Sequence, residues 1–197
     1  MLIRHLGLKP YSEVMAKQFT LLQRRASGEA PDTLLLAQHP SVYTRGIASR
    51  QRAAHKLPFP LRTVDREGGI FYHCPGQLAG YPVFDLRTRQ LTLTAYRRSL
   101  EGVLIEALDG LEVKAVRSKG AVGLWARGRK LVFIGVAARE GISCHGFVLN
   151  VNCDLGPFRH ITPRSGPGWT SLAELLGKPL DETAVAKAVA EAFLRYF

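Results

Sequence analysis

The sequence predicts an α+β domain with a mainly antiparallel sheet flanked by helices. Short apolar runs separated by glycine-containing turns are typical of such a sheet, and longer segments with apolar residues at helical spacing indicate the helices. The chain has 197 residues, of which 46% are hydrophobic, enough for one domain with a substantial core. Because it contains no repeat, no low-complexity tract and no clear linker, we expect residues 1–197 to form a single domain.

The N-terminal half is expected to begin with a strand over residues 2–8 and a helix over residues 11–26. The helix is indicated by apolar residues at helical spacing and by Gly28 just after its end. Further strands are expected over residues 33–37, 61–65 and 81–86. Residues 44–60 are expected to form a loop, and the pair Gly68-Gly69 is expected to interrupt the chain between strands.

The C-terminal half is expected to hold the core of the sheet. A helix should begin at Thr92 or Thr94 and end before Gly110. Strands are then expected over residues 112–117, 121–126, 130–139 and 147–152, with a tight turn at residues 127–129. A long loop over residues 153–168 precedes a short helix that Ser171 opens with a capping box, and Asp181 caps the last helix.

The hydropathy and cysteine patterns favour the cytoplasm. No segment approaches the roughly 18 apolar residues that a membrane span requires, and the first residues lack the apolar run of a signal peptide. We therefore expect no membrane partner. Three cysteines cannot all pair within one chain, and their neighbours do not form a zinc-binding pattern. We expect free thiols and no metal site.

Positive charge is concentrated in the first 170 residues. The chain has a net charge of +11, and residues 171–197 hold three basic and four acidic side chains, so residues 1–170 carry +12. Such an excess predicts an acidic partner. Nucleic acid is not expected, because the sequence has no block of Lys and Arg and no RNP-like, zinc-finger or helix-turn-helix pattern. An acidic protein and an acyl anion remain as candidate partners.

Glycines and polar side chains are combined in a way that is typical of ligand sites. The combination occurs in residues 65–78, 128–135, 143–152 and 158–172. Gly68 and Gly69 would let the backbone approach a ligand while Arg66 or His73 bonds to a polar head group. Lys130 stands at the mouth of an apolar strand. Each stretch also has a plain structural interpretation, as a turn with a hydrogen-bonded histidine or as a solvated lysine at a hairpin end.

The order and wording of these stretches carry a family resemblance. Residues 34–46 match the pattern Leu-Leu-Leu-x-x-His-Pro-x-Val-Tyr-Thr-x-Gly. Further matching segments are Tyr72-His73-x-Pro-Gly-Gln, Lys130 with Ile134-Gly135, His145-Gly146-x-x-Leu-Asn-Val-Asn, and Thr170-Ser171-Leu172. Each is weak alone, but together and in this order they cover most of the chain. They resemble the lipoyl(octanoyl) transferases.

The resemblance implies a reaction and its partners. An octanoyl group, or a lipoyl group, would be transferred from acyl carrier protein to one lysine of a lipoyl domain, in 2-oxoacid dehydrogenases or glycine cleavage proteins. No cofactor is implied, and the implied fold is that of the biotin and lipoate protein ligases. Both partner proteins are typically acidic, which would suit the net charge of +12 on residues 1–170.

The resemblance also implies which residues handle the acyl group. Lys130 would sit near the thioester, and the glycines and Ile134 would line an acyl tunnel. The implied binding residues are Arg66, Glu67, Gly68, Gly69, Ile70, Phe71, Tyr72 and His73, then Phe133, Ile134 and Gly135, and finally Gly146, Phe147 and Val148.

The family's nucleophile is missing from this sequence. In the family, the cysteine of Ile-x-Pro-Cys-Gly attacks the thioester, and the lysine lowers the pKa of that cysteine. The matching segment here is Ile161-Thr162-Pro163-Arg164-Ser165. A guanidinium stays protonated near neutral pH and cannot be a nucleophile. Glu67 and Cys74, each at a family glycine position, are two smaller departures.

Three interpretations of this departure remain open. Cys74 would supply a substitute thiol in the first. In the second, the acceptor lysine attacks the thioester directly, with Arg164 and Lys130 stabilising the oxyanion or with Lys130 acting as a base. In the third, the chain binds acyl groups or lipoyl domains without turnover. An ATP-dependent lipoate ligase is expected less, because residues 64–69 match the pattern Arg-Arg-x-x-Gly-Gly-Gly poorly.

Overall fold

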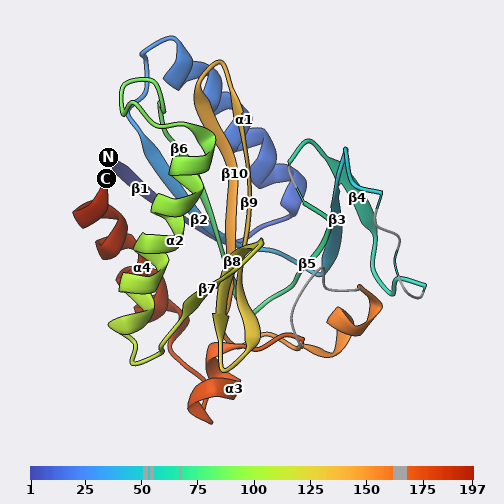
Figure 1. Ribbon diagram of the computed structural model, residues 1–197. Coiled ribbons are helices and arrows are strands. Elements are labelled where there is room, and N and C mark those ends of the chain that lie inside the picture. The colour runs from blue at the N-terminus through green and yellow to red at the C-terminus, as the bar shows by residue number, and fades with distance from the viewer. Residues whose placement is uncertain (51–52, 54–55, 67, 162–167) are drawn as a thin grey trace.

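The protein is built around a seven-stranded sheet and a separate three-stranded sheet (Figure 1). The computed structural model describes residues 1–50, 53, 56–66, 68–161 and 168–197. In the order in which they lie side by side, the strands of the large sheet are β1 (Leu2–Leu8), β2 (Thr33–Gln38), β6 (Gln77–Val83), β10 (Ile142–Asn150), β9 (Arg129–Arg139), β8 (Ala121–Ala126) and β7 (Val116–Ser118). Every neighbouring pair is antiparallel except β1 and β2. The expected mainly antiparallel sheet is confirmed.

Helices cover both faces of the large sheet. On one face, α2 (Leu93–Asp109) and α4 (Glu182–Tyr196) bury their apolar residues in what we call the α2–α4 core. On the other face, α1 (Tyr11–Ala26) contributes to a second core, the α1 core. Neighbouring residues of β10 enter the two cores in turn, Val148 the α1 core and Leu149 the α2–α4 core. No helix among the described residues is long and apolar enough to cross a bilayer.

The small sheet lies on the same side of the large sheet as α1 (Figure 1). Its strands are β4 (Leu61–Val64), β3 (Val42–Gly46) and β5 (Ile70–His73), in that order. We expected a loop over residues 44–60 and did not predict β3 or β5. Both strands are short, and each is defined by pairing with the other across the intervening segment. Local sequence carries no signal for such a pairing.

The signals for helix starts are confirmed. Thr92, Ser171 and Asp181 each accept a hydrogen bond from a backbone N–H of the helix that follows. The helix after Ser171 is α3 (Leu172–Leu176). These side chains act within a few residues of themselves, so the sequence alone is sufficient to locate them.

Strand boundaries differ more from expectation. β6 begins before residue 81, β10 begins before residue 147, and β7 covers only the end of the expected run over residues 112–117. A strand extends as far as its partner does, and that partner is distant in the sequence. The loop expected over residues 153–168 contains a short 3-10 helix, η1 (Gly156–His160). The turn at residues 127–129 is confirmed, because Arg127 and Gly128 both have the positive φ of a two-residue hairpin.

The α2–α4 core offers a test of the fold. Phe193 is fully buried and stacks on Phe147 of β10, with ring centroids 5.7 Å apart, whereas the next residue, Leu194, is 56% exposed. We expect Phe193→Ala to lower the free energy of unfolding by about 3–5 kcal/mol, because it removes buried apolar area and leaves a cavity. Leu194→Ala should change it by no more than about 0.5 kcal/mol. Urea denaturation of both variants measures the difference, and equal losses would contradict this packing.

Candidate active site

Three of the sequence stretches meet at one small cavity of about 20 Å³. Its lining comes from both sheets and from the start of α1. The predicted binding residues that line it are Arg66, Phe71, His73, Gly135, Gly146, Phe147 and Val148. Tyr11, Tyr81 and His145 line it as well and were not predicted as binding residues. No local pattern singles out the two tyrosines, because the fold alone brings them to the cavity.

Arg66 places a buried positive charge in the wall of this cavity. Its guanidinium donates hydrogen bonds to the carbonyl oxygens of Gly69 (3.0 Å) and Thr44 (2.8 Å) and to Thr44 Oγ1 (2.9 Å). It also lies 3.9 Å above the ring centroid of Phe71. Burial lowers the pKa of Arg66 to about 10, so the group remains charged near neutral pH. Gly68, with a φ of +90°, turns the chain so that the carbonyl of Gly69 can reach the guanidinium.

Two of the histidines around the cavity are buried and neutral near pH 7. Burial lowers the pKa of His73 well below its usual value and also lowers the pKa of His39, which hydrogen-bonds to Tyr81. His73 Nε2 lies 3.3 Å from Thr44 Oγ1, and its Nδ1 has no hydrogen-bond partner among the described residues. A neutral imidazole with an unpartnered nitrogen can bond to an incoming polar group.

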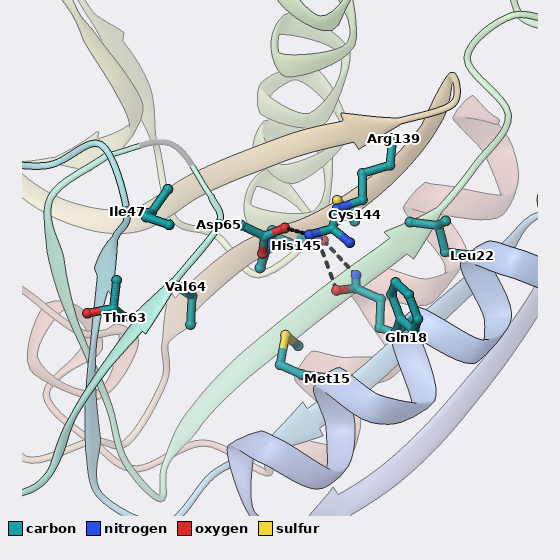
Figure 2. A pocket seen from close by; sticks show the side chains of 11 residues that line it. Met15, Gln18, Leu22, Ile47, Thr63, Val64, Asp65, Arg139, Cys144 and His145 are labelled. Carbon is teal, nitrogen blue, oxygen red and sulfur yellow. Dashed lines mark hydrogen bonds and ion pairs between the residues drawn. The ribbon is translucent and has the colours of Figure 1, made fainter.

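His145 lines both this cavity and a larger groove of about 390 Å³, and Figure 2 shows the groove. Its Nε2 lies 2.9 Å from Asp65 Oδ1, and Gln18 of α1 bonds to both its backbone N–H and its carbonyl. These two bonds hold its backbone at a φ of +56°. Burial lowers the pKa of His145, although Asp65 acts in the opposite direction. The sequence places His145 in a motif. It does not predict the contact with Asp65, because the two residues are 80 positions apart in the chain.

Lys130 is brought to the α1 side of the sheet by an irregularity in β9. The pairing of β8 with β9 shifts between Leu124 and Trp125, so Leu131 is an extra residue and enters the α2–α4 core together with Val132. Lys130 and Phe133 therefore share a face. A regular strand would have placed two residues three apart on opposite faces.

The ammonium of Lys130 is held by a carbonyl oxygen and two rings. Nζ donates to the Val122 carbonyl oxygen (3.0 Å) and lies 4.8 Å and 5.0 Å from the ring centroids of Trp125 and Phe133. Gly123, with a φ of +120°, leaves room for this side chain: a Cβ there would lie 3.0 Å from Lys130 Cε and 2.4 Å from the Val132 carbonyl oxygen.

Aromatic rings connect Lys130 with the cavity. Phe133 lies next to the ammonium, and its ring centroid is 5.1 Å from that of Phe71. The guanidinium of Arg66 lies over the other ring, that of Phe71. Trp169 stacks on Phe133 at 4.8 Å. A row of packed aromatic rings, which we call the aromatic path, thus links Lys130 at one end to Arg66 and the histidine-lined cavity at the other.

Some predicted residues lie away from this path. The side chain of Ile134 enters the α2–α4 core, because side chains alternate along β9, so the expectation that it lines the tunnel does not hold. Ile70 and Tyr72 pack inside the α1 core rather than against the cavity. Glu67 and Arg164 fall outside the described residues.

The three cysteines carry free buried thiols, as expected. Cys74 packs in the α1 core and does not line the cavity. The thiols of Cys74 and Cys153 interact by a hydrogen bond, and this hydrogen bond together with burial raises the pKa of Cys153. Burial raises the pKa of Cys144 to about 11. Within the described ranges, no group of His, Cys, Asp and Glu is arranged to hold a metal ion.

The buried histidines predict a loss of stability in acid. The pKa of His73 is lower in the folded protein than in the unfolded chain, so below about pH 6.5 the unfolded chain binds a proton that the folded protein does not. This contribution is complete above pH 6.5 and is lost as the pH falls.

We expect the free energy of unfolding to fall between pH 7 and pH 5, and to fall less steeply in His73→Gln, by up to about 1.4 kcal/mol per pH unit. Urea titrations at several pH values measure this slope. His5→Gln, at an exposed position, is the matched control. A His73→Gln slope equal to that of the control would show that His73 is protonated when folded.

Comparison with known proteins agrees with the fold and the motifs. The family model of the lipoyl protein ligase A/B catalytic domain matches residues 10–194. Octanoyltransferases of Syntrophotalea carbinolica and Geobacter metallireducens are each 40% identical to the chain, over 95% and 98% of its length and 90% and 92% of theirs.

Solved structures of ligases share the fold at low identity. A lipoate-protein ligase A bound with ATP superposes with a TM-score of 0.76 at 16% identity, covering 100% of this chain and 85% of its own. A bi-partite lipoate protein ligase of Thermoplasma acidophilum, described with its E2 lipoyl domain, gives 0.72 at 15% identity, covering 99% and 82%. With its fold, its motifs and 40% identity to octanoyltransferases in agreement, the chain belongs to the lipoyl protein ligase A/B catalytic domain family.

Proposed function

We propose that this protein is an acyltransferase that moves an octanoyl group, or a lipoyl group, from acyl carrier protein to the acceptor lysine of a lipoyl domain. Curated relatives at 40% identity over nearly the whole chain are named octanoyltransferase. The observation that carries the proposal is the path from Lys130 to the cavity, on which the family's binding segments converge. We place the reaction in the cytoplasm, where acyl carrier proteins hold their acyl groups.

The acyl chain would lie along the aromatic path. Its thioester end would sit at Lys130 and its methyl end would point toward the cavity beside Phe71, Gly135 and Gly146. The cavity of about 20 Å³ has room for about one water molecule, so binding requires Phe71 or Phe133 to turn aside. The burial of the hydrocarbon tail between aromatic rings would then supply the affinity, at about 0.8 kcal/mol per CH₂.

Direct attack by the acceptor lysine is the mechanism that the described residues support best. The amine of the lipoyl domain attacks the thioester carbonyl, the carbon–sulfur bond breaks, and the amine's proton leaves with the carrier's thiol. A tetrahedral oxyanion forms in between. The Lys130 ammonium stabilises this oxyanion from a position that is half-buried, where charges interact more strongly than in water.

Two alternatives are supported less well. Lys130 Nζ donates a hydrogen bond to the Val122 carbonyl oxygen and faces two aromatic rings, so these contacts engage it as a donor rather than as a base. Cys74 is enclosed in the α1 core beside Cys153, away from the cavity, so it is poorly placed to replace the missing nucleophile. A protein that binds acyl groups without turnover is an outcome of the tests below.

The assignment of Lys130 is tested by substitution. We expect Lys130→Ala to slow octanoyl transfer at least about 100-fold, because an oxyanion loses its preorganised cation. Lys130→Arg, which keeps the charge, should retain more activity than Lys130→Ala. The readout is the mass of a lipoyl domain after incubation with octanoyl-acyl carrier protein. Lys114→Ala, at an exposed position, is the control, and transfer that survives Lys130→Ala would remove Lys130 from the site.

The missing nucleophile is tested by the mass of the protein itself. After incubation with octanoyl-acyl carrier protein alone, we expect no covalent acyl adduct, and we expect Cys74→Ser to transfer at the unmodified rate, because direct attack uses no thiol of this chain. An adduct that disappears in Cys74→Ser would establish Cys74 as the nucleophile instead. Binding of the carrier without adduct or transfer would show a non-catalytic protein. Arg164→Cys should gain an octanoyl thioester if only the nucleophile is lacking.

A further inference from the structure

A cleft of about 520 Å³ lies between α2 and the β7–β8 hairpin, at the edge of the large sheet. Its charged lining is strongly basic. Arg97 and Arg98 come from α2, and Arg117 and Lys119 come from β7 and the turn after it. Arg98, Arg117 and Lys119 are exposed, so an incoming anion can reach them.

The acid that lines this cleft does not cancel its charge. Glu101 is buried, and its carboxylate accepts hydrogen bonds from Arg117 Nε (2.9 Å) and from the backbone N–H of Gly123 (3.2 Å). Arg117 in turn donates to the carbonyl oxygen of Arg98 (3.2 Å), which holds the two arginines together. The cleft is lined by four cationic side chains and by one carboxylate, which is already hydrogen-bonded to Arg117 and Gly123. Its lining therefore has a net positive charge.

The cleft and the candidate active site share strand β8. Val122 lines the cleft, and its carbonyl oxygen accepts the hydrogen bond from Lys130 Nζ. Glu101 also anchors Gly123, the residue over which the Lys130 side chain lies. A molecule seated in the cleft therefore rests against the strand that holds the ammonium of Lys130.

The chemistry of the two substrates decides which of them fits here. Both partners are typically acidic proteins, so what distinguishes them is the group that each brings to the site. The acceptor brings a lysine, whose ammonium would be repelled by the four cations of the cleft. The donor presents acidic side chains and an acyl thioester at the end of a pantetheine arm, which is joined to the carrier by a phosphodiester. Arginine guanidinium groups pair well with phosphate and carboxylate oxygens.

We propose that this basic cleft docks the acidic acyl carrier protein that delivers the acyl group, and orients its arm toward Lys130. The inference rests on the proposed function for the identity of the carrier. It adds the surface and residues that select the donor over the acceptor. A carrier bound here would be steered by long-range attraction, so its affinity should fall with rising salt.

The test compares two doubly substituted proteins with the same change in net charge. Arg98→Glu with Lys119→Glu reverses two exposed cations of the cleft. Lys17→Glu with Arg24→Glu reverses two exposed cations on α1, across the large sheet. We expect the cleft variant to raise the Kd for octanoyl-acyl carrier protein about tenfold or more, with a weaker salt dependence, and the α1 variant to leave it nearly unchanged.

Acyl donors of increasing size distinguish which anionic group of the carrier the cleft binds. Octanoyl-pantetheine has neither phosphate nor protein, so its transfer should be equal in the unsubstituted protein and the cleft variant. A loss with octanoyl-phosphopantetheine would assign the cleft to the phosphodiester, and a loss with the whole carrier alone would assign it to carboxylates of the carrier. Both results support the proposal.

Three results would overturn it: an unchanged Kd in the cleft variant, an equal loss in the α1 variant, or a KM increase for the lipoyl domain instead of the carrier. The Kd is measured by fluorescence anisotropy of labelled octanoyl-acyl carrier protein and needs no turnover. A protein that transfers nothing from any donor but binds the carrier through the cleft would refute the proposed function and leave the docking surface standing.

Discussion

The site depends on the alternation of side chains along β9 and β10, the strands that separate the two cores. Each residue of β10 is buried, so every side chain must enter either the α2–α4 core or the α1 core. Where neither core has room, glycine is required: a Cβ on Gly146 would lie 2.0 Å from the Gly80 carbonyl oxygen. The extra residue Leu131 breaks the alternation once and thereby brings Lys130 and Phe133 to one face.

Neutral groups contact both cations of the site. Carbonyl oxygens and a ring hold Arg66, and a carbonyl oxygen and two rings hold Lys130. Such partners stabilise a cation without themselves adding a negative charge to the site. The buried neutral imidazole of His73 adds a hydrogen-bonding atom without adding charge.

In the transfer that we propose, the family cysteine is absent, and Lys130 is the member of the cysteine–lysine pair that the sequence retains. Lys130 is in place, whereas the described thiols are buried outside the cavity. A cation that stabilises an oxyanion can serve an attacking thiolate or an attacking amine, because both attacks place negative charge on the carbonyl oxygen. Direct transfer requires donor and acceptor to be bound at the same time. The basic cleft that we propose for the donor would leave the rest of the surface to the acceptor.

Local sequence was sufficient for features that act over a few residues. It predicted the helix caps at Thr92, Ser171 and Asp181 and the hairpin turn at Arg127-Gly128. It also contains the motifs by which the family is recognised. The tertiary structure decided what depends on distant partners: the pairing of β3 with β5, the choice between Phe133 and Ile134 for the site face, and the bond between Asp65 and His145. The physical reason is that a side chain's direction on a strand follows from register and bulges. These are set by neighbouring strands rather than by the residues beside it in the chain.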